Sequence, residues 1–272
     1  MFFHIFCKIM KKQFYREGRR MIEIINVTSE NVHKYGFFCM RSKPKSQGYQ
    51  SKLRWLNKRF NEGLKLKIIQ EDGRQRGFIE YIPGSFTWRA VHAKEYMVIH
   101  CFWIVGKNKG KGFGRTLLNE CVEEAKRLNL SGVVLVTSEK GWLPNKSFFE
   151  KKGFKLVDEM SEFELMVLNF KDEVTPSFYN WHDTAKEYSN GITIFKSDQC
   201  PFILDAVLHL EEAAEELGIK VNLIELDSFE MVQQKSPTPF GVFTVIFDGE
   251  IISYHPQTKN KFIQLLEKRK NK

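Results

Sequence analysis

The sequence lacks every cysteine pattern that would define a disulfide framework or a zinc site. Its five cysteines are an odd number, no two stand closer than 20 residues, and no Cys-x-x-Cys occurs. A secretion signal is missing as well, because the short apolar run at residues 2–6 precedes the basic residues instead of following them. These absences predict a protein of the reducing cytoplasm.

Long apolar runs and internal repeats are also absent. The longest apolar run, residues 96–105, is about half of the roughly 20 residues that span a bilayer, so we expect a buried strand and no membrane partner. A composition of 42% hydrophobic and 28% charged residues excludes a largely disordered chain. A length of 272 residues favours two compact domains.

The net charge of +9 is unevenly distributed. Residues 1–20 contain six Lys and Arg against one Glu, whereas residues 21–272 contain 36 basic and 32 acidic residues, a net charge of +4. The run Arg16-Glu17-Gly18-Arg19-Arg20 can be encoded by purine-rich codons, as a bacterial ribosome-binding site would be. We therefore hypothesise that residues 1–20 are a basic leader and that translation starts at Met21; the alternative is a basic, poorly ordered tail.

Hydrophobic periodicity divides the remainder into two units. Residues 21–170 alternate strands and helices, residues 171–190 lose all periodicity and are predicted to be a linker, and residues 191–272 show a smaller βαβ-ββα pattern. The first unit has predicted strands at 22–27, 64–70, 76–82, 98–105, 133–136, 155–158 and 163–168, and predicted helices over 49–60, 117–128 and 145–152.

A glycine-rich loop lies between the buried strand at 98–105 and the following helix. It reads Lys109-Gly110-Lys111-Gly112-Phe113-Gly114, with Lys107 and Arg115 beside it. Glycines allow close approach of a ligand, and the free N–H groups at a helix start favour an anion, so the loop is a candidate phosphate cradle. It lacks the Gly-Lys-Ser/Thr of a nucleotide P-loop, and the alternative is a flexible basic loop.

At this loop the sequence resembles the GCN5-related N-acetyltransferases (GNAT), whose phosphate loop has the form Arg/Gln-x-x-Gly-x-Gly/Ala. Family members also carry an Asn early in the next-to-last helix and end it with Tyr-x-x-x-Gly-Phe, where this chain has Phe-x-x-x-Gly-Phe at 149–154. The resemblance implies a mixed α/β fold and acetyl-CoA as co-substrate. The residues it assigns to the cofactor are Ile104, Val105, Lys109, Gly110, Lys111, Gly112, Phe113, Gly114, Arg115, Asn145 and Phe149.

Three further segments, residues 48–56, 77–84 and 99–103, resemble the YoaP-type acetyltransferases, which carry a small thioredoxin-like domain after the GNAT domain. The resemblance therefore implies a GNAT mixed central sheet with flanking helices over 21–170, followed by a thioredoxin-like βαβ-ββα domain over 191–272. Within that second domain, Cys200 stands after a strand and before Pro201 and a helix, where such a fold carries its attacking thiol. The partner position is Ile203, so a two-thiol cycle is not expected.

Acetyl transfer to an amine needs a group that removes the ammonium proton. Glu80, between Ile79 and Tyr81, and His100, within the apolar strand, are the candidates. The alternatives are a solvated strand glutamate and a satisfied core histidine. The family's thiolate donor is a Tyr where this chain has Phe149, so either another hydroxyl, such as that of Tyr81, donates or the thiolate leaves unaided. Other candidate hydroxyls are those of Tyr96, Ser138 and Ser147.

The sequence as a whole predicts an acetyl-CoA-dependent N-acetyltransferase that works by direct transfer in a ternary complex. Its acceptor is expected to be a small-molecule or peptide amine, with no metal. No nucleic-acid partner is expected, because the net charge divides into the leader and a local cluster of four cations, Lys107, Lys109, Lys111 and Arg115, at one loop. Two other functions stay open: a CoA-binding module without turnover, and a thiol-redox protein that acts through Cys200.

Overall fold

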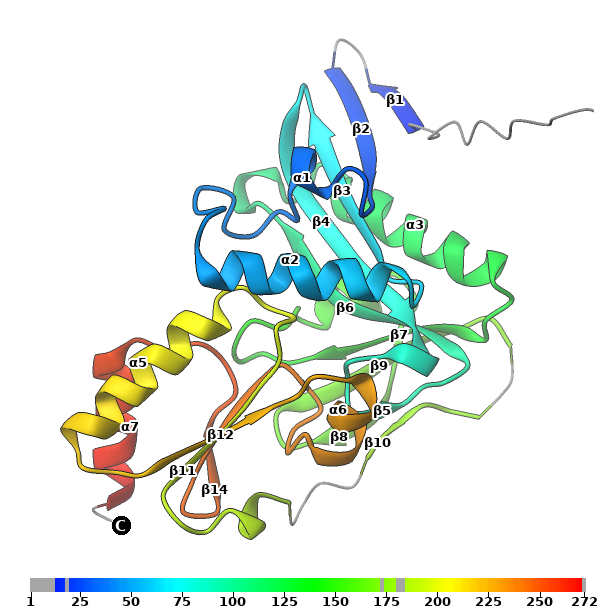
Figure 1. Cartoon of the computed structure of the whole chain (residues 1–272). Coiled ribbons are helices and arrows are strands. Elements are labelled where there is room, and N and C mark those ends of the chain that lie inside the picture. Colours follow the sequence, from blue (N-terminus) through cyan, green and yellow to red (C-terminus); the bar gives the residue numbers. More distant parts are fainter. Residues whose placement is uncertain (1–12, 18–19, 172–173, 180–183, 271–272) are drawn as a thin grey trace, which may run out of the picture.

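A computed structural model describes residues 13–17, 20–171, 174–179 and 184–270, with side chains from Arg20 onward (Figure 1). Its core is an eight-stranded central sheet in the order β1-β2-β3-β4-β6-β7-β9-β8. The strands are β1 (Gln13–Glu17), β2 (Arg20–Val27), β3 (Lys65–Glu71), β4 (Arg74–Pro83), β6 (Tyr96–Ile104), β7 (Gly132–Thr137), β8 (Lys155–Met160) and β9 (Phe163–Asn169). A mixed α/β fold is what the sequence predicted.

Part of the predicted leader belongs to this sheet. Gln13–Glu17 pairs antiparallel with β2, from Gln13 opposite Ile24 to Glu17 opposite Arg20. The expectation of a loose tail is therefore wrong for these five residues, which pair with the outer backbone groups of β2. Residues 1–12 and 18–19 lie outside the described residues, and translation from Met21 stays a hypothesis.

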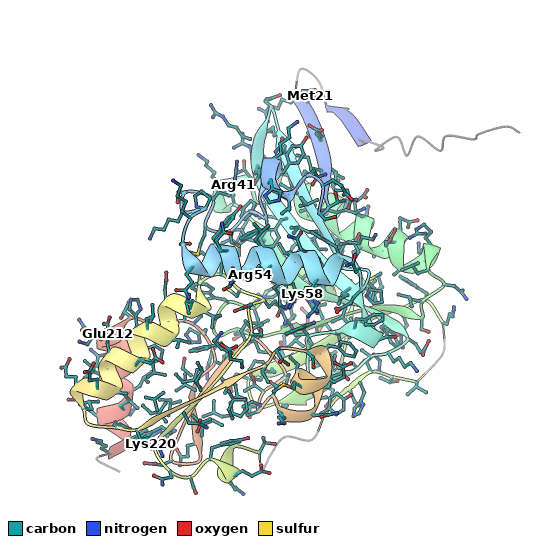
Figure 2. All side chains as sticks on the ribbon, viewed as in Figure 1. Met21, Arg41, Arg54, Lys58, Glu212 and Lys220 are labelled. Atoms are coloured by element: carbon teal, nitrogen blue, oxygen red, sulfur yellow. The ribbon has the colours of Figure 1, made fainter. Side chains whose placement is uncertain are left out.

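Helices cover both faces of the central sheet. α2 (Gln47–Phe60) packs Tyr49, Trp55 and Leu56 onto one face and turns Arg54 and Lys58 outward (Figure 2). α3 (Phe113–Arg127) covers the other face with an apolar stripe that includes Leu117 and Cys121. The short helices are α1 (Val32–Tyr35), α4 (Ser147–Glu150), η1 (Gly84–Phe86) and η2 (Gly106–Asn108). None of the helices in the described ranges has the length and apolarity needed to cross a bilayer.

The centre of the sheet opens between β6 and β7, its one parallel pair among the described strands. These strands pair from Tyr96 opposite Gly132 to Ile99 opposite Leu135, and the ladder stops there although both strands continue. On its other edge β6 carries a bulge, because Glu80 and Tyr81 of β4 lie opposite Cys101 and Ile99 and leave His100 without a partner. The bulge and the opening therefore coincide.

The C-terminal domain forms a second, four-stranded sheet in the order β12-β11-β13-β14. Its elements are β11 (Ile192–Lys196), α5 (Ile203–Glu216), β12 (Val221–Glu225), α6 (Phe229–Lys235), β13 (Phe243–Phe247), β14 (Glu250–Ser253) and α7 (Lys259–Lys270). β11 and β12 are parallel and the others antiparallel, which gives the βαβ-ββα order that the sequence predicted, with α6 inserted. Its thioredoxin-like class stays a prediction.

The segment between the two sheets is more structured than a linker. Its described parts contain β10 (Ser177–Phe178), which pairs with β5 (Val91–His92), and η3 (Thr184–Glu187). The two sheets also share one apolar cluster, so the boundary at 171–190 stays a prediction. The cluster includes Val98, Val134, Val136 and Leu165 from the central sheet and Ile203, Val207, Leu210 and Val245 from the C-terminal domain.

Candidate active site

The glycine-rich loop connects β6 to α3 through η2. Gly112 is the N-cap of α3 in the left-handed conformation, with a φ of 82°, and no side chain caps the helix start. A Cβ at Gly110 or Gly112 would meet nothing within 4 Å, so the space beside the loop is open. Lys107, Lys109, Lys111 and Arg115 are all exposed around it. Uncapped N–H groups, the helix dipole and four cations favour an anion at this end of α3, and its binding of a phosphate stays a prediction.

Two of the other predicted cofactor residues, Ile104 and Phe149, pack in the apolar cluster that contains the inner face of α3. Phe149 is fully buried, and its ring lies 5.5 Å from that of Phe102 and 5.1 Å from that of Phe148. Ile104 belongs to the same apolar cluster. The Val105 N–H donates to the carbonyl of Arg76 at 2.9 Å and so is already bonded. The exposed Asn145 accepts from the Ser147 N–H at 2.9 Å.

Glu80 lies on β4, opposite Cys101 of β6 and beside the bulge, and its side chain meets Lys52 of α2. Its Oε2 accepts from Lys52 Nζ at 2.6 Å, and both side chains are at most 5% exposed. Burial raises the pKa of Glu80, but the Lys52 ammonium and the neighbouring His100 outweigh burial and lower it to about 2. Glu80 is therefore an ionised carboxylate that already holds one cation. Its Oε1 is buried and makes no hydrogen bond with the described residues.

His100 faces Glu80 as a neutral ring. Its Nε2 accepts from the Trp88 N–H at 3.1 Å, which assigns the ring proton to Nδ1, 3.7 Å from Glu80 Oε1. Burial is the main cause that lowers the pKa of His100, to about 4. Since Trp88 occupies the lone pair on Nε2, this geometry favours the core-histidine alternative, and a catalytic role stays a prediction.

Tyr81 lies on the opposite face from its neighbour Glu80. It is fully buried in the cluster that contains Leu117 and Cys121, and its hydroxyl donates to the Glu120 carbonyl at 3.4 Å. Burial raises the pKa of Tyr81, so the phenol stays protonated. The structure brings Glu80 and His100 together and separates Tyr81 from them, as alternation along a strand requires.

Cys200 lies two residues before Phe202, the N-cap of α5. Burial raises the pKa of this thiol to about 11, against a smaller lowering by the Phe202 backbone. Two more thiols interact electrostatically with it, Cys101 of β6 and Cys39 of the segment before α2. Burial raises the pKa of both, so all three thiols are protonated at neutral pH.

Three residues that the sequence did not single out complete this interior: Lys52, Arg89 and Gln199. Lys52 gives a weak signal, because it lies on the inner face of α2 between Tyr49 and Trp55. Arg89 and Gln199 give none, because they meet across 110 positions of sequence, with Nη1 of Arg89 donating to Oε1 of Gln199 at 2.6 Å. Among the described residues, no group of three or more His, Cys, Asp or Glu side chains could hold a metal ion.

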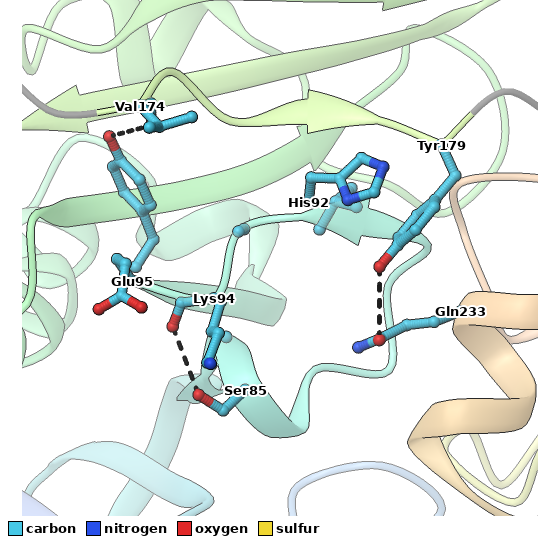
Figure 3. A pocket seen from close by; sticks show the side chains of 11 residues that line it. Ser85, His92, Lys94, Glu95, Val174, Tyr179 and Gln233 are labelled. Atoms are coloured by element: carbon cyan, nitrogen blue, oxygen red, sulfur yellow. Dashed lines mark hydrogen bonds between the residues drawn. The ribbon is translucent and has the colours of Figure 1, made fainter.

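A cavity of about 650 Å³ lies at the other end of β6 (Figure 3). Ser85, His92 and Lys94 contribute to its wall, and the Tyr179 hydroxyl donates to Gln233 Oε1 at 3.5 Å across it. It contains none of the predicted catalytic or cofactor residues. A smaller cavity of about 290 Å³ borders the glycine-rich loop at Lys111 and Phe113.

The glycine-rich loop after a buried strand, leading into an uncapped helix start, agrees with the resemblance to acetyltransferases of the GNAT type. Residues 25–154 match the acetyltransferase (GNAT) family, and residues 221–264 match the YoaP-like family. The chain is 33% identical over 247 residues to the "uncharacterized N-acetyltransferase YoaP" of Bacillus subtilis strain 168, covering 89% of this chain and 97% of that protein. It belongs to this family of acetyltransferases, which confirms the resemblance.

Solved structures with a similar fold include two acetyltransferases. The PaiA N-acetyltransferase from Thermoplasma acidophilum in complex with coenzyme A is 19% identical, with a TM-score of 0.39 over 55% of this chain and 99% of that one. A GNAT-family acetyltransferase from Staphylococcus aureus Mu50 is 15% identical, with a TM-score of 0.41 over 55% and 99% of the two chains.

Proposed function

We propose that the protein transfers the acetyl group of acetyl-CoA directly to an amine, in a ternary complex and without an acyl-enzyme. The opening of the central sheet carries this proposal. β6 leaves β7 after Ile99 and continues into a loop that ends at an uncapped, cationic helix start. An extended thioester with a pyrophosphate at one end fits such an arrangement, because a free strand edge is followed by an anion site.

In this proposal the pyrophosphate binds the first N–H groups of α3 and the surrounding cations. Gly110 and Gly112 leave room for it, since no atom lies within 4 Å of a Cβ at either position. The acetyl end lies at the opening, next to the His100 bulge. Glu80 and His100 face each other beside the bulge on the α2 side of the sheet, from which the amine would enter.

The chemistry assigned to the interior follows from its charges. Glu80 Oε1, buried and without a hydrogen bond, binds the incoming ammonium and receives its first proton, which gives the neutral amine that attacks. The C–N bond forms and the C–S bond breaks, the CoA thiolate leaves with the electron pair, and the second proton that the nitrogen loses passes to the thiolate to give the free thiol. A thiol pKa of about 8.5 lets the thiolate leave unaided, so Phe149 in place of a Tyr is compatible with turnover.

Calorimetry with acetyl-CoA, paired with a matched glycine substitution, tests the site. Gly112→Val should abolish binding, because a side chain would fill the cradle and strain a φ of 82°. Gly218→Val is the control: Gly218 also has a positive φ, 64°, and open space, but lies after α5. Equal losses in both variants, or no binding by the unmodified protein below millimolar acetyl-CoA, would reject the proposal.

A CoA-binding module without turnover is the competing function, and one observation favours it: Glu80 is already paired with Lys52. Thiol release from acetyl-CoA over a panel of amino acids, polyamines, aminoglycosides and lysine peptides separates the two. Release with at least one amine, lost in Gly112→Val, supports transfer. Binding without release from any amine supports the module.

A further inference from the structure

Arg89 joins the two domains from the connection between η1 and β5. Its guanidinium is fully buried and donates on one side to the main-chain carbonyl of His100, at the bulge of β6. On the other side Nη1 donates to Oε1 of Gln199 at 2.6 Å and to the carbonyl of Phe240 at 3.0 Å, both in the C-terminal domain. Nη1 also lies 3.3 Å from the Trp88 carbonyl. One side chain thus links the bulge to two separate segments of the C-terminal domain.

The acceptors of Arg89 are all neutral. No carboxylate among the described residues forms an ion pair with it, and burial is the main cause that lowers its pKa, to about 10. At neutral pH it remains a buried cation. A buried charge held only by carbonyls contributes little net stability compared with well-packed apolar side chains, but it fixes the positions of the groups it bonds.

The position that Arg89 fixes is the one the proposed reaction needs. His100 is the bulged residue of β6, and β6 leaves β7 directly before it. A bulge has lost its ladder partner, so the orientation of its peptide groups depends on other contacts. Here the described contact to the His100 carbonyl comes from Arg89.

We propose that Arg89 is a positioning residue through which the C-terminal domain, by way of Gln199 and Phe240, holds the β6 bulge in the geometry required for acetyl transfer. This inference rests on the proposed acetyltransferase function. It gives the C-terminal domain a task in that reaction: without the Gln199 and Phe240 acceptors, the guanidinium would be free to leave the bulge. A misplacement of about 1 Å at a reacting centre can lower the rate about 100-fold.

The test removes the link from the C-terminal side, in the full chain. Gln199→Met deletes the acceptor for Arg89 and keeps the size of the side chain, whereas Gln199→Glu keeps an acceptor oxygen and adds charge. Arg89→Lys shortens the link itself. Arg59→Lys is the matched control, because Arg59 is a buried arginine of α2 that pairs with Glu62 and lies over the Trp88 ring, and no described hydrogen bond or ion pair joins it to His100 or Gln199.

Two readouts report on the bulge. The first is the rate of acetyl transfer to the best amine of the panel, separated into kcat and KM for acetyl-CoA. The second needs no acceptor: the ¹³C resonance of [1-¹³C]acetyl-CoA when bound, with circular dichroism as the check on folding. We expect kcat to fall about 10-fold in Gln199→Met and about 100-fold in Arg89→Lys, with KM for acetyl-CoA changed less than about 3-fold. The bound carbonyl resonance should move toward its value in free acetyl-CoA in both variants, while Gln199→Glu and Arg59→Lys match the unmodified protein.

Each other outcome is decisive. An unmodified protein that does not bind acetyl-CoA rejects the proposed function, and this inference falls with it. Binding and transfer that are unchanged in Gln199→Met and Arg89→Lys overturn the positioning role alone. Equal losses in Gln199→Met and Gln199→Glu, or in Arg59→Lys, would show that packing rather than the link is responsible. If Arg89→Lys does not fold, the Gln199 pair decides.

Discussion

The glycine-rich loop and the Glu80 interior solve opposite electrostatic problems. Around the loop, uncapped backbone N–H groups and exposed cations lie together. Their mutual repulsion lowers stability only a little, because water screens these charges. Around Glu80, one buried carboxylate pairs with Lys52 and interacts weakly with a second buried cation, Arg89. The loop is therefore suited to binding an anion, and the surroundings of Glu80 are suited to holding side chains in fixed positions. We expect substitutions in the loop to change mainly the affinity for acetyl-CoA, and substitutions around Glu80 to change mainly the free energy of unfolding.

Removing the buried carboxylate should have the largest effect. Glu80→Leu leaves Lys52 as an unpaired buried cation, so the free energy of unfolding in urea should fall by about 3–5 kcal/mol. The double variant Glu80→Leu/Lys52→Met should recover most of the loss, because both charges are gone. A double variant no more stable than the single one would contradict this account, and Lys109→Ala in the loop should change stability by less than about 0.5 kcal/mol.

The second-largest expected effect is a loss of stability in acid, caused by the buried groups His100 and Glu80. His100 has a pKa of about 4 when folded against an ordinary value of 6.5, so between these values the unfolded chain binds a proton that the folded one does not. Stability is therefore lost as the pH falls from 6.5 toward 4, by about 3 kcal/mol in all. The lowered pKa of Glu80 extends the same trend from 4.5 toward 2. In His100→Gln, the free energy of unfolding in urea should depend less on pH above about pH 4.5 than in the unmodified protein. An unchanged pH dependence would show that His100 is not its cause.

The smallest expected effects belong to the exposed cations of the loop. Lys109→Ala and Arg115→Ala should each weaken acetyl-CoA binding by about 0.5–1 kcal/mol at low salt, measured by calorimetry. Raising the ionic strength from about 0.05 to about 0.5 M should reduce these losses of binding free energy, because the Debye screening length becomes shorter. Lys220→Ala, an exposed lysine of the C-terminal domain, is the control. A loss of binding as complete as that of Gly112→Val would mean that side chains rather than the backbone form the cradle.

The parts of the site that could be predicted from sequence are the ones encoded locally. The loop from Lys109 to Gly114 can be recognised in the sequence because a predicted strand, three glycines and a predicted helix start follow one another directly. The same holds for the order of strands around it. Phe149 was found by its spacing to Gly153, and the structure places it in the apolar cluster expected of a phenylalanine.

The rest depends on contacts between distant segments. The spacing of Lys52 predicts an inner-face residue of α2 but not its 2.6 Å bond to a strand 28 residues later. Arg89 and Gln199 are polar residues without a motif, and only tertiary folding makes them partners. Tyr81 is a candidate because its hydroxyl could donate to the thiolate; strand alternation places it on the opposite face from Glu80, and its role stays a prediction.

The apolar cluster that spans both sheets has a consequence for how such a chain can evolve. Val134 and Leu165 of the central sheet pack in the same cluster as Ile203 and Val245 of the C-terminal domain. If one of the two domains were exchanged for that of a different protein, the two apolar surfaces that meet in this cluster would no longer be matched in shape. A change of side-chain volume in one half of this cluster therefore has to be accommodated by repacking in the other half.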